Sequence, residues 1–188
     1  MLWEGTSLDS LAVECISESP FSHVSMVITD PTTKQKCLLQ AVSEALGPDP
    51  LVHGSTHTGV QAGDLEATMK IVYGMKDQPT WRPYSPARSQ RDLDSDVWTL
   101  ATKLDGIPFP QELWELAVLL VSGRELNSEV LSPLFCSGLV AHVLQKVRVI
   151  ADTSACNGFF PKDFSSGFPG HFEVIAGTYA DDLKIDMS

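Results

Sequence analysis

The stretch SPLFCSGLVAHVL, residues 132–144, has the pattern of a helix that begins just before a cysteine. Ser132 can accept a hydrogen bond from a backbone N–H of the first turn, and Pro133 suits the first helical position. Apolar residues then recur at helical spacing, at Leu139, Val140, Val143, Leu144 and Val147. The pattern predicts a helix with Cys136 in its first turn, on or beside the apolar stripe.

Cys136 fits two interpretations. Near a helix N-terminus, the helix dipole and the unpaired backbone N–H groups favour thiolate over thiol, and the same N–H groups can stabilise an oxyanion. A free cysteine on an apolar helical face is, on the other hand, usually a packing residue. Its position alone leaves both interpretations open, and a nucleophile also needs a general base.

A candidate base lies in FSHVSMVITDPTTKQKCLLQAV, residues 21–42, where two β-rich segments flank Asp30-Pro31-Thr32-Thr33. Pro31 and Asp30 are typical turn residues, so the segment predicts a β-hairpin. A turn centred between Pro31 and Thr32 places His23 opposite Gln40, whose side-chain oxygen can orient an imidazole. Glu44 is an alternative orienter, because it shares a face with Gln40 if the strand continues that far.

The remaining segments have weaker patterns. Residues 46–63 are rich in Gly, Pro, Ser and Thr and predict a long loop, followed by a strand over 65–75. Helices are expected over 95–106, capped by Asp94 or Ser95, and over 109–123. A short strand is expected at 171–176, and the tail from residue 180 to 188 is expected to be frayed.

Length and composition favour one domain over residues 1–188. The chain has 188 residues, 43% of them hydrophobic, which is enough for a core without disulfide bonds. A formal net charge of −11 argues against nucleic acid and anionic membrane surfaces as partners. The cysteines, Cys15, Cys37, Cys136 and Cys156, form no C-x-x-C pair, so neither a zinc knuckle nor a disulfide scaffold is expected.

No stretch approaches the roughly 18 apolar residues of a membrane span, and the N-terminus has no secretory pattern, so a cytoplasmic protein is expected. His53 and His57 are possible metal ligands, but their loop offers no clear third ligand. We therefore expect no metal and no cofactor. His142 is expected on the outer or flanking surface of the 132–144 helix.

Five segments carry a resemblance to a known family when taken in order: SPFSHVSMVI, LLQAV, KLDGIPFP, LFCSGLVAHVL and FFPKDF. Together they span residues 19–164 and resemble the circularly permuted papain-like superfamily of NlpC-type peptidases, in particular the YiiX/YaeF-like amidases. In that family the histidine precedes the cysteine, as His23 precedes Cys136 here. The resemblance implies an α+β fold with an antiparallel sheet or small barrel packed against helices, and the nucleophile at a helix N-terminus.

The resemblance also implies a thiol hydrolase or acyltransferase, with Cys136 as nucleophile, His23 as base and Gln40 as orienter. The substrate class it allows is broad: a peptide, an amide conjugate or a lipid acyl group. Two positions depart from the family pattern, since Gln40 and Gly138 stand where glutamate is usual. A binding or regulatory module without turnover is therefore the alternative, and neither the substrate nor the oligomeric state is predicted.

Overall fold

The structure is a computed structural model that describes residues 1–5, 8–45, 47–52, 56–74, 78–110, 115, 118, 133–168 and 172–185. Its α-helices are α1 (Leu8–Ser17), α2 (Leu65–Gly74), α3 (Gln90–Leu104) and α5 (Cys136–Lys146). Three short 3₁₀ helices are η1 (Pro50–Val52), η2 (Cys156–Gly158) and η3 (Pro161–Phe164). The strands are β1 (Leu2–Glu4), β2 (His23–Val24), β3 (Met26–Thr29), β4 (Lys36–Val42), β5 (Gly59–Asp64), β6 (Gln78–Trp81), β7 (Tyr84–Ser85), β8 (Thr178–Tyr179) and β9 (Leu183–Lys184).

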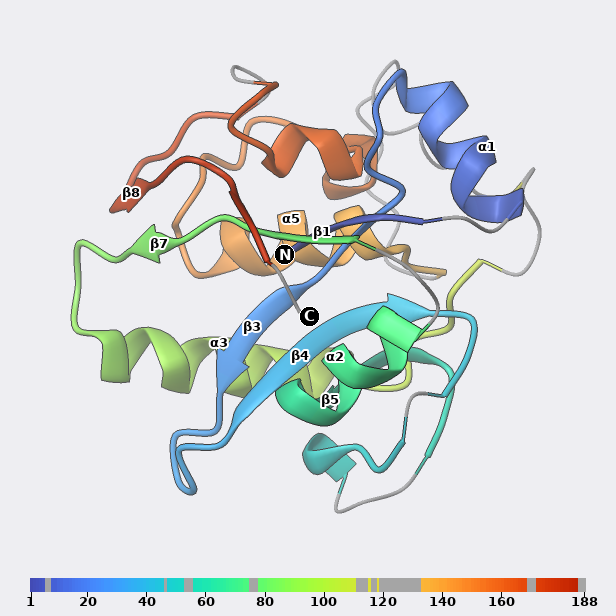
Figure 1. Cartoon of the computed structure of the whole chain (residues 1–188). Helices are drawn as coiled ribbons and strands as arrows, with labels where there is room; N and C mark the ends of the chain where they lie inside the picture. The colour runs from blue at the N-terminus through green and yellow to red at the C-terminus, as the bar shows by residue number, and fades with distance from the viewer. Residues whose placement is uncertain are drawn as a thin grey trace.

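These strands form three antiparallel sheets (Figure 1), so the expected α+β class is confirmed. One sheet has the order β3-β4-β5, a second β2-β1-β6-β9, and a third pairs β7 with β8. Between β2 and β3 the chain changes sheet at Ser25, whose hydroxyl accepts a hydrogen bond from the indole N–H of Trp3 at 2.9 Å. His23 therefore lies in a different sheet from Gln40.

The predicted hairpin is present as β3 and β4. The Asp30 carboxylate accepts a hydrogen bond from the backbone N–H of Thr32 at 2.7 Å, as its position in the turn suggests. The register pairs Met26 with Leu39, one step from a turn centred between Pro31 and Thr32. The hairpin begins only at Met26, so His23 pairs with Trp3 of β1 and not with Gln40.

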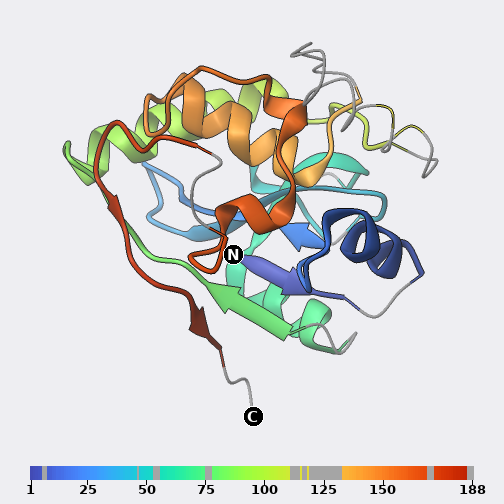
Figure 2. The same ribbon diagram turned by 90° about the horizontal axis from the view of Figure 1, so that it is seen from above.

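Strand β4 is buried on both faces, which explains its nearly continuous apolar sequence. Cys37, Leu39 and Ala41 belong to the main core, which includes residues of α3 and α5. Leu38 faces a second cluster with Trp3 and Met69 of α2. Figure 2 shows α3 and α5 side by side, with α1 set apart from them near the other end of the molecule. The sheet is thus covered by helices on both faces.

Two segments differ from the prediction between residues 46 and 75. Residues 65–74 form helix α2 and not a strand, because the Asp64 carboxylate accepts the backbone N–H of Ala67 at 2.8 Å and so caps the helix start. Residues 59–63, expected within a loop, form β5 together with Asp64 and pair with β4. Gly59 has φ +92°, and a Cβ there would lie 2.2 Å from the Ile107 carbonyl oxygen, so the close approach requires glycine.

The helix expected over 95–106 is present as α3 and begins earlier, at Gln90. The helix expected over 109–123 lies outside the described residues except at Phe109, Pro110, Glu115 and Val118. In the expected strand at 171–176, Val174 forms a single bridge with Ile150. The tail is paired with β6 at Leu183–Lys184, so it is not frayed there. Within the described residues, no helix has both the length and the apolar character needed to cross a membrane.

Candidate active site

Cys136 is the first residue of α5, which begins later than the sequence pattern suggests. Ser132 lies outside the described residues, and Pro133 precedes the helix. The residue before the helix is Phe135, which has extended backbone angles and makes no side-chain capping hydrogen bond. The N–H groups at the helix start are therefore available to a group at the position of the Cys136 side chain.

Three backbone N–H groups each act to lower the pKa of the Cys136 thiol: those of Val24, Ser137 and Cys136 itself. Two come from the start of α5, and the third comes from β2. The sulfur is therefore held between the helix N-terminus and the strand that carries His23. Because each of these groups stabilises negative charge, the site favours a thiolate once it forms.

Burial raises the pKa of the Cys136 thiol, and this effect is larger than that of the three N–H groups. Cys136 is only 6% exposed, and this desolvation raises its pKa from 9.0 to about 11, in spite of the three N–H groups. The N–H groups at the start of α5 therefore do not bring the pKa of the thiol below its ordinary value in the protein without substrate. At neutral pH, Cys136 is a thiol.

His23 is half-buried in β2, directly before the residue whose N–H faces the sulfur. Desolvation lowers the pKa of His23 from 6.5 to about 4, while a side-chain hydrogen bond with Gln40 works in the opposite direction. The imidazole is thus neutral at pH 7. A neutral imidazole can accept a proton, as a general base must.

Gln40 lies in the middle of β4, pairs with Gln61 of β5 and is only 2% exposed. Its side chain reaches His23 from the neighbouring sheet. The contact between His23 and Gln40 was expected between two paired strands, but it joins two different sheets. Within the described residues, Nε2 of His23 and Nε2 of Gln40 are buried without a hydrogen-bond partner. Such atoms mark a place where a bound molecule can supply the missing partner.

Glu44 does not share this environment. Strand β4 ends at Val42, and Glu44 follows it with an exposed side chain. Only its backbone carbonyl is engaged, by the Gln61 amide at 2.9 Å. Glu44 was expected to share a strand face with Gln40 only if the strand continued to residue 44. Because β4 ends at Val42, that arrangement does not occur.

The segment around DGIPF links the sheet to the chain that leads into α5. Val60 of β5 donates to the Ile107 carbonyl and accepts from the Gly106 N–H, at 2.8 and 2.9 Å. The carbonyl of Pro108, the next residue after Ile107, accepts a hydrogen bond from the backbone N–H of Leu134 at 2.9 Å. Residues 106–108 therefore fix the approach to Cys136.

The segment FFPKDF fixes the other side of α5. The Ser137 hydroxyl donates to the Phe159 carbonyl at 2.6 Å, and the Asp163 carboxylate accepts the Phe160 N–H at 2.7 Å in η3. The buried Phe135 and Phe160 pack together with Phe109 and with Val13 of α1. An apolar cluster therefore borders the residue that precedes Cys136.

Gly138 lies where α5 packs closely against neighbouring segments. A Cβ at Gly138 would lie 3.4 Å from Leu134 Cδ1 and 3.6 Å from the backbone of both Asn157 and Cys156. This part of α5 packs against η2, and every residue from Cys136 to Gln145 is buried. A glutamate would have to place its carboxylate in this contact.

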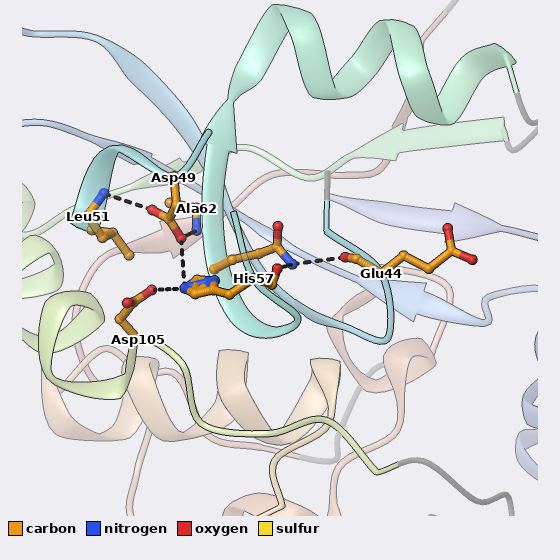
Figure 3. A network of polar contacts seen from close by, with 7 residues as sticks. Glu44, Asp49, Leu51, His57, Ala62 and Asp105 are labelled. Carbon is orange, nitrogen blue, oxygen red and sulfur yellow. Dashed lines mark hydrogen bonds and ion pairs between the residues drawn. The ribbon is translucent and has the colours of Figure 1, made fainter. Parts of the chain in front are cut away.

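A second polar cluster was missed in the sequence (Figure 3). His57 Nε2 lies 3.0 Å from Asp105 Oδ1 and 3.6 Å from Asp49 Oδ2. Desolvation and the neighbouring Asp49 carboxylate raise the pKa of Asp105 to about 6, against the opposite effect of His57. Asp49 lies only eight residues before His57, in the same predicted loop, whereas Asp105 lies 48 residues after His57 in sequence.

Two other histidine predictions have different outcomes. His142 is 4% exposed, so the expectation of a surface position is wrong. It lies on α5, whose residues are buried from Cys136 to Gln145 because both α3 and η2 pack against the helix. His53 lies outside the described residues.

No protein-family model matches the chain, and no curated protein gives a significant match to it. The functional argument therefore depends on the geometry of the site.

Proposed function

We propose that the chain is a thiol hydrolase of the circularly permuted papain-like, NlpC-type fold, with Cys136 as nucleophile, His23 as general base and Gln40 as the residue that positions the imidazole. The observation that carries the proposal is the junction of β2 with the start of α5. There, β2 packs against α5, the Val24 N–H acts to lower the pKa of the Cys136 thiol, and the Gln40 side chain acts to raise the pKa of the adjacent His23.

The order of the segments supports the fold part of the proposal. The histidine strand comes first, the Gln40 strand second, the DGIPF segment third and the cysteine helix fourth. The same segments that carry the resemblance make the contacts around Cys136 in space. We propose a single catalytic domain over residues 1–188.

The proposed reaction begins from a neutral thiol and a neutral imidazole. As Cys136 Sγ attacks the carbonyl carbon, His23 takes the thiol proton, a C–S bond forms, and the carbonyl electron pair moves onto oxygen. The N–H groups at the start of α5 stabilise the developing negative charge. His23 then gives its proton to the leaving amine or alcohol, and water or another acceptor cleaves the thioester.

The proposed substrate is an amide or ester of a peptide, an amide conjugate or a lipid acyl group. A net charge of −11 favours a neutral or cationic substrate over a polyanion. A reducing compartment such as the cytoplasm fits the proposal, because all four cysteines are free.

A second candidate function is a binding module on the same fold. Gln40 carries no charge that would stabilise an imidazolium, and the Cys136 thiol is nearly inaccessible and has a raised pKa. These observations favour a protein that binds a carbonyl compound at the site without cleaving it.

Hydrolysis of p-nitrophenyl esters and aminoacyl p-nitroanilides distinguishes the two functions. The hydrolase predicts turnover that Cys136→Ala abolishes and that His23→Ala lowers by about 10²–10⁴-fold, the usual contribution of a general base. The matched control is Cys15→Ser, which removes an exposed thiol of α1 and should leave the rate unchanged. Turnover that survives in Cys136→Ala would exclude the proposal. Saturable binding of a substrate amide without turnover would favour the binding module.

A further inference from the structure

The cluster of Asp49, His57 and Asp105 is built by three separate segments. Asp49 follows the loop after β4, His57 precedes β5, and Asp105 follows the last residue of α3. Their side chains converge on one point in Figure 3. In this arrangement a histidine nitrogen lies between two carboxylates, and each can be a metal ligand.

The Asp49 carboxylate is held in place by backbone N–H groups. Asp49 Oδ1 accepts the Leu51 N–H at 2.7 Å, and Asp49 Oδ2 accepts the Ala62 N–H at 2.8 Å. The backbone of His57 is fixed by the Gln61 amide, which donates to its carbonyl at 3.0 Å. Hydrogen bonds of this kind orient the ligands of protein metal sites, and each carboxylate oxygen keeps a second lone pair.

Two carboxylates lie against one imidazole in this cluster. The side chains of Asp49 and Asp105 are only 1% and 8% exposed, and both carboxylates lie next to His57 Nε2. Two carboxylates that are so close together and so little hydrated repel each other, and a bound cation would stabilise both. Within the described residues, His57 Nδ1 is also a buried polar atom without a partner. This nitrogen points away from the cluster, so only Nε2 of the imidazole faces the two carboxylates.

We propose that Asp49, His57 and Asp105 bind a divalent transition-metal ion such as Zn²⁺. The three ligand atoms lie within 4.8 Å of one another. Metal–ligand bonds of about 2.0–2.2 Å at tetrahedral or octahedral angles separate neighbouring ligand atoms by about 2.8–3.6 Å. The separations of 3.0 and 3.6 Å from His57 Nε2 fall in this range. The ion neutralises both carboxylates, and the 24% exposure of the His57 side chain leaves one side open to water.

The proposed ion fixes the segment that leads to the nucleophile. Asp105 is followed by Gly106–Pro108, whose backbone is hydrogen-bonded to β5 and to Leu134. The ion would join this segment to the loops that carry Asp49 and His57. Its role is thus structural, and the proposal does not depend on catalysis by Cys136.

The test is a calorimetric titration of chelator-treated full-length protein with ZnCl₂. We expect one saturable site per chain and a higher unfolding temperature with Zn²⁺. His57→Ala and Asp105→Asn should each weaken binding by more than about 10-fold, the scale on which even the loss of supporting groups weakens metal sites. Glu66→Gln removes an exposed carboxylate outside the cluster and is the matched control.

A second arm excludes binding at the candidate active site. Zn²⁺ affinity should be unchanged in Cys136→Ala, and Co²⁺ bound to wild type should give no thiolate-to-metal charge-transfer absorption. The proposal is overturned if wild type shows no saturable binding, if His57→Ala and Asp105→Asn bind as tightly as wild type, or if Cys136→Ala loses the site. The wild-type titration and the Co²⁺ spectrum decide the matter even if a variant does not fold.

Discussion

At the scale of single residues, the proposed mechanism depends on two groups that burial keeps neutral. Desolvation raises the pKa of Cys136 to about 11 and lowers that of His23 to about 4. A preformed thiolate–imidazolium pair would require the reverse order of the two values. The proton therefore moves from sulfur to nitrogen during the attack, when the forming C–S bond compensates for charge separation.

The pH dependence of kcat/KM tests this picture. His23 acts as a base only when neutral, so activity is present above its pKa and lost below it. We expect the acidic limb near pH 4, not near the ordinary 6.5 of a histidine. The check is a profile of p-nitrophenyl ester hydrolysis from pH 3.5 to 8, in buffers of constant ionic strength. An acidic limb at pH 6–7 would show that His23 is not desolvated in the free enzyme.

Gln40→Glu tests the role of the residue next to His23. A carboxylate at this position favours the imidazolium and raises the pKa of His23, so the acidic limb should move to higher pH. Gln40→Met keeps a similar volume without charge and should not move the limb upward. A limb that stays in place in Gln40→Glu would mean that the side chain does not act on His23.

At the scale of elements, α5 is a buried helix whose first residue is the proposed nucleophile. Its apolar stripe predicted the helix, because 3.6-residue periodicity is encoded locally. The first helical residue was predicted wrongly, since Ser132 and Pro133 are plausible start signals and only contacts of Leu134 and Ser137 with distant segments set the start at Cys136. Gly138 belongs to the same packing, which sequence alone does not reveal.

Substitutions at Gly138 separate helix propensity from packing. A Cβ there makes ordinary contacts at 3.4 and 3.6 Å, so Gly138→Ala should stabilise the protein by up to about 1 kcal/mol. Gly138→Glu should destabilise it by about 2 kcal/mol or more, because its carboxylate is buried against η2. Urea denaturation followed by circular dichroism measures both changes. A Gly138→Glu protein as stable as wild type would contradict the packing of α5 on η2.

At the scale of the whole molecule, the parts that the sequence predicted are those with local signals. The β3–β4 hairpin follows from Asp30 and Pro31, whose turn chemistry needs no distant partner. Strand β5 was missed because GVQAGD is buried on both faces and lacks alternation, and its pairing with β4 is decided by tertiary contacts. The Asp64 cap of α2 was a usable signal that was overlooked.

The candidate site shows the same division between local and long-range information. Cys136, His23 and Gln40 were chosen from motif order, and the structure brings Gln40 to His23 and β2 to Cys136. The sequence does not predict that His23 and Gln40 come from different sheets, because the change of sheet at Ser25 depends on the pairing of β2 with β1. Asp105 could not be linked to His57 for the same reason, because the two residues are 48 positions apart, whereas Asp49 lies in the same predicted loop as His57.

The stability of the whole protein should depend on pH through His23. Its pKa is lower in the folded state than the ordinary 6.5, so the unfolded state binds the proton more readily. The stabilisation is complete above pH 6.5 and is lost as the pH falls toward 4. Denaturant midpoints at pH 7 and pH 5 should therefore differ less in His23→Gln, which cannot titrate, than in wild type. Equal differences in the two proteins would contradict the burial of His23.

The most direct test of the central claim is acylation of Cys136, measured by intact-protein and peptide mass spectrometry after mixing with p-nitrophenyl acetate at pH 7. The account predicts a single acetyl adduct at Cys136 in wild type, formed about 10²–10⁴-fold more slowly in His23→Ala. Cys15→Ser should acylate at the wild-type rate, because Cys15 lies exposed on α1. An adduct that forms at the same rate without His23, or that never forms at Cys136, would contradict a Cys136–His23 catalytic pair.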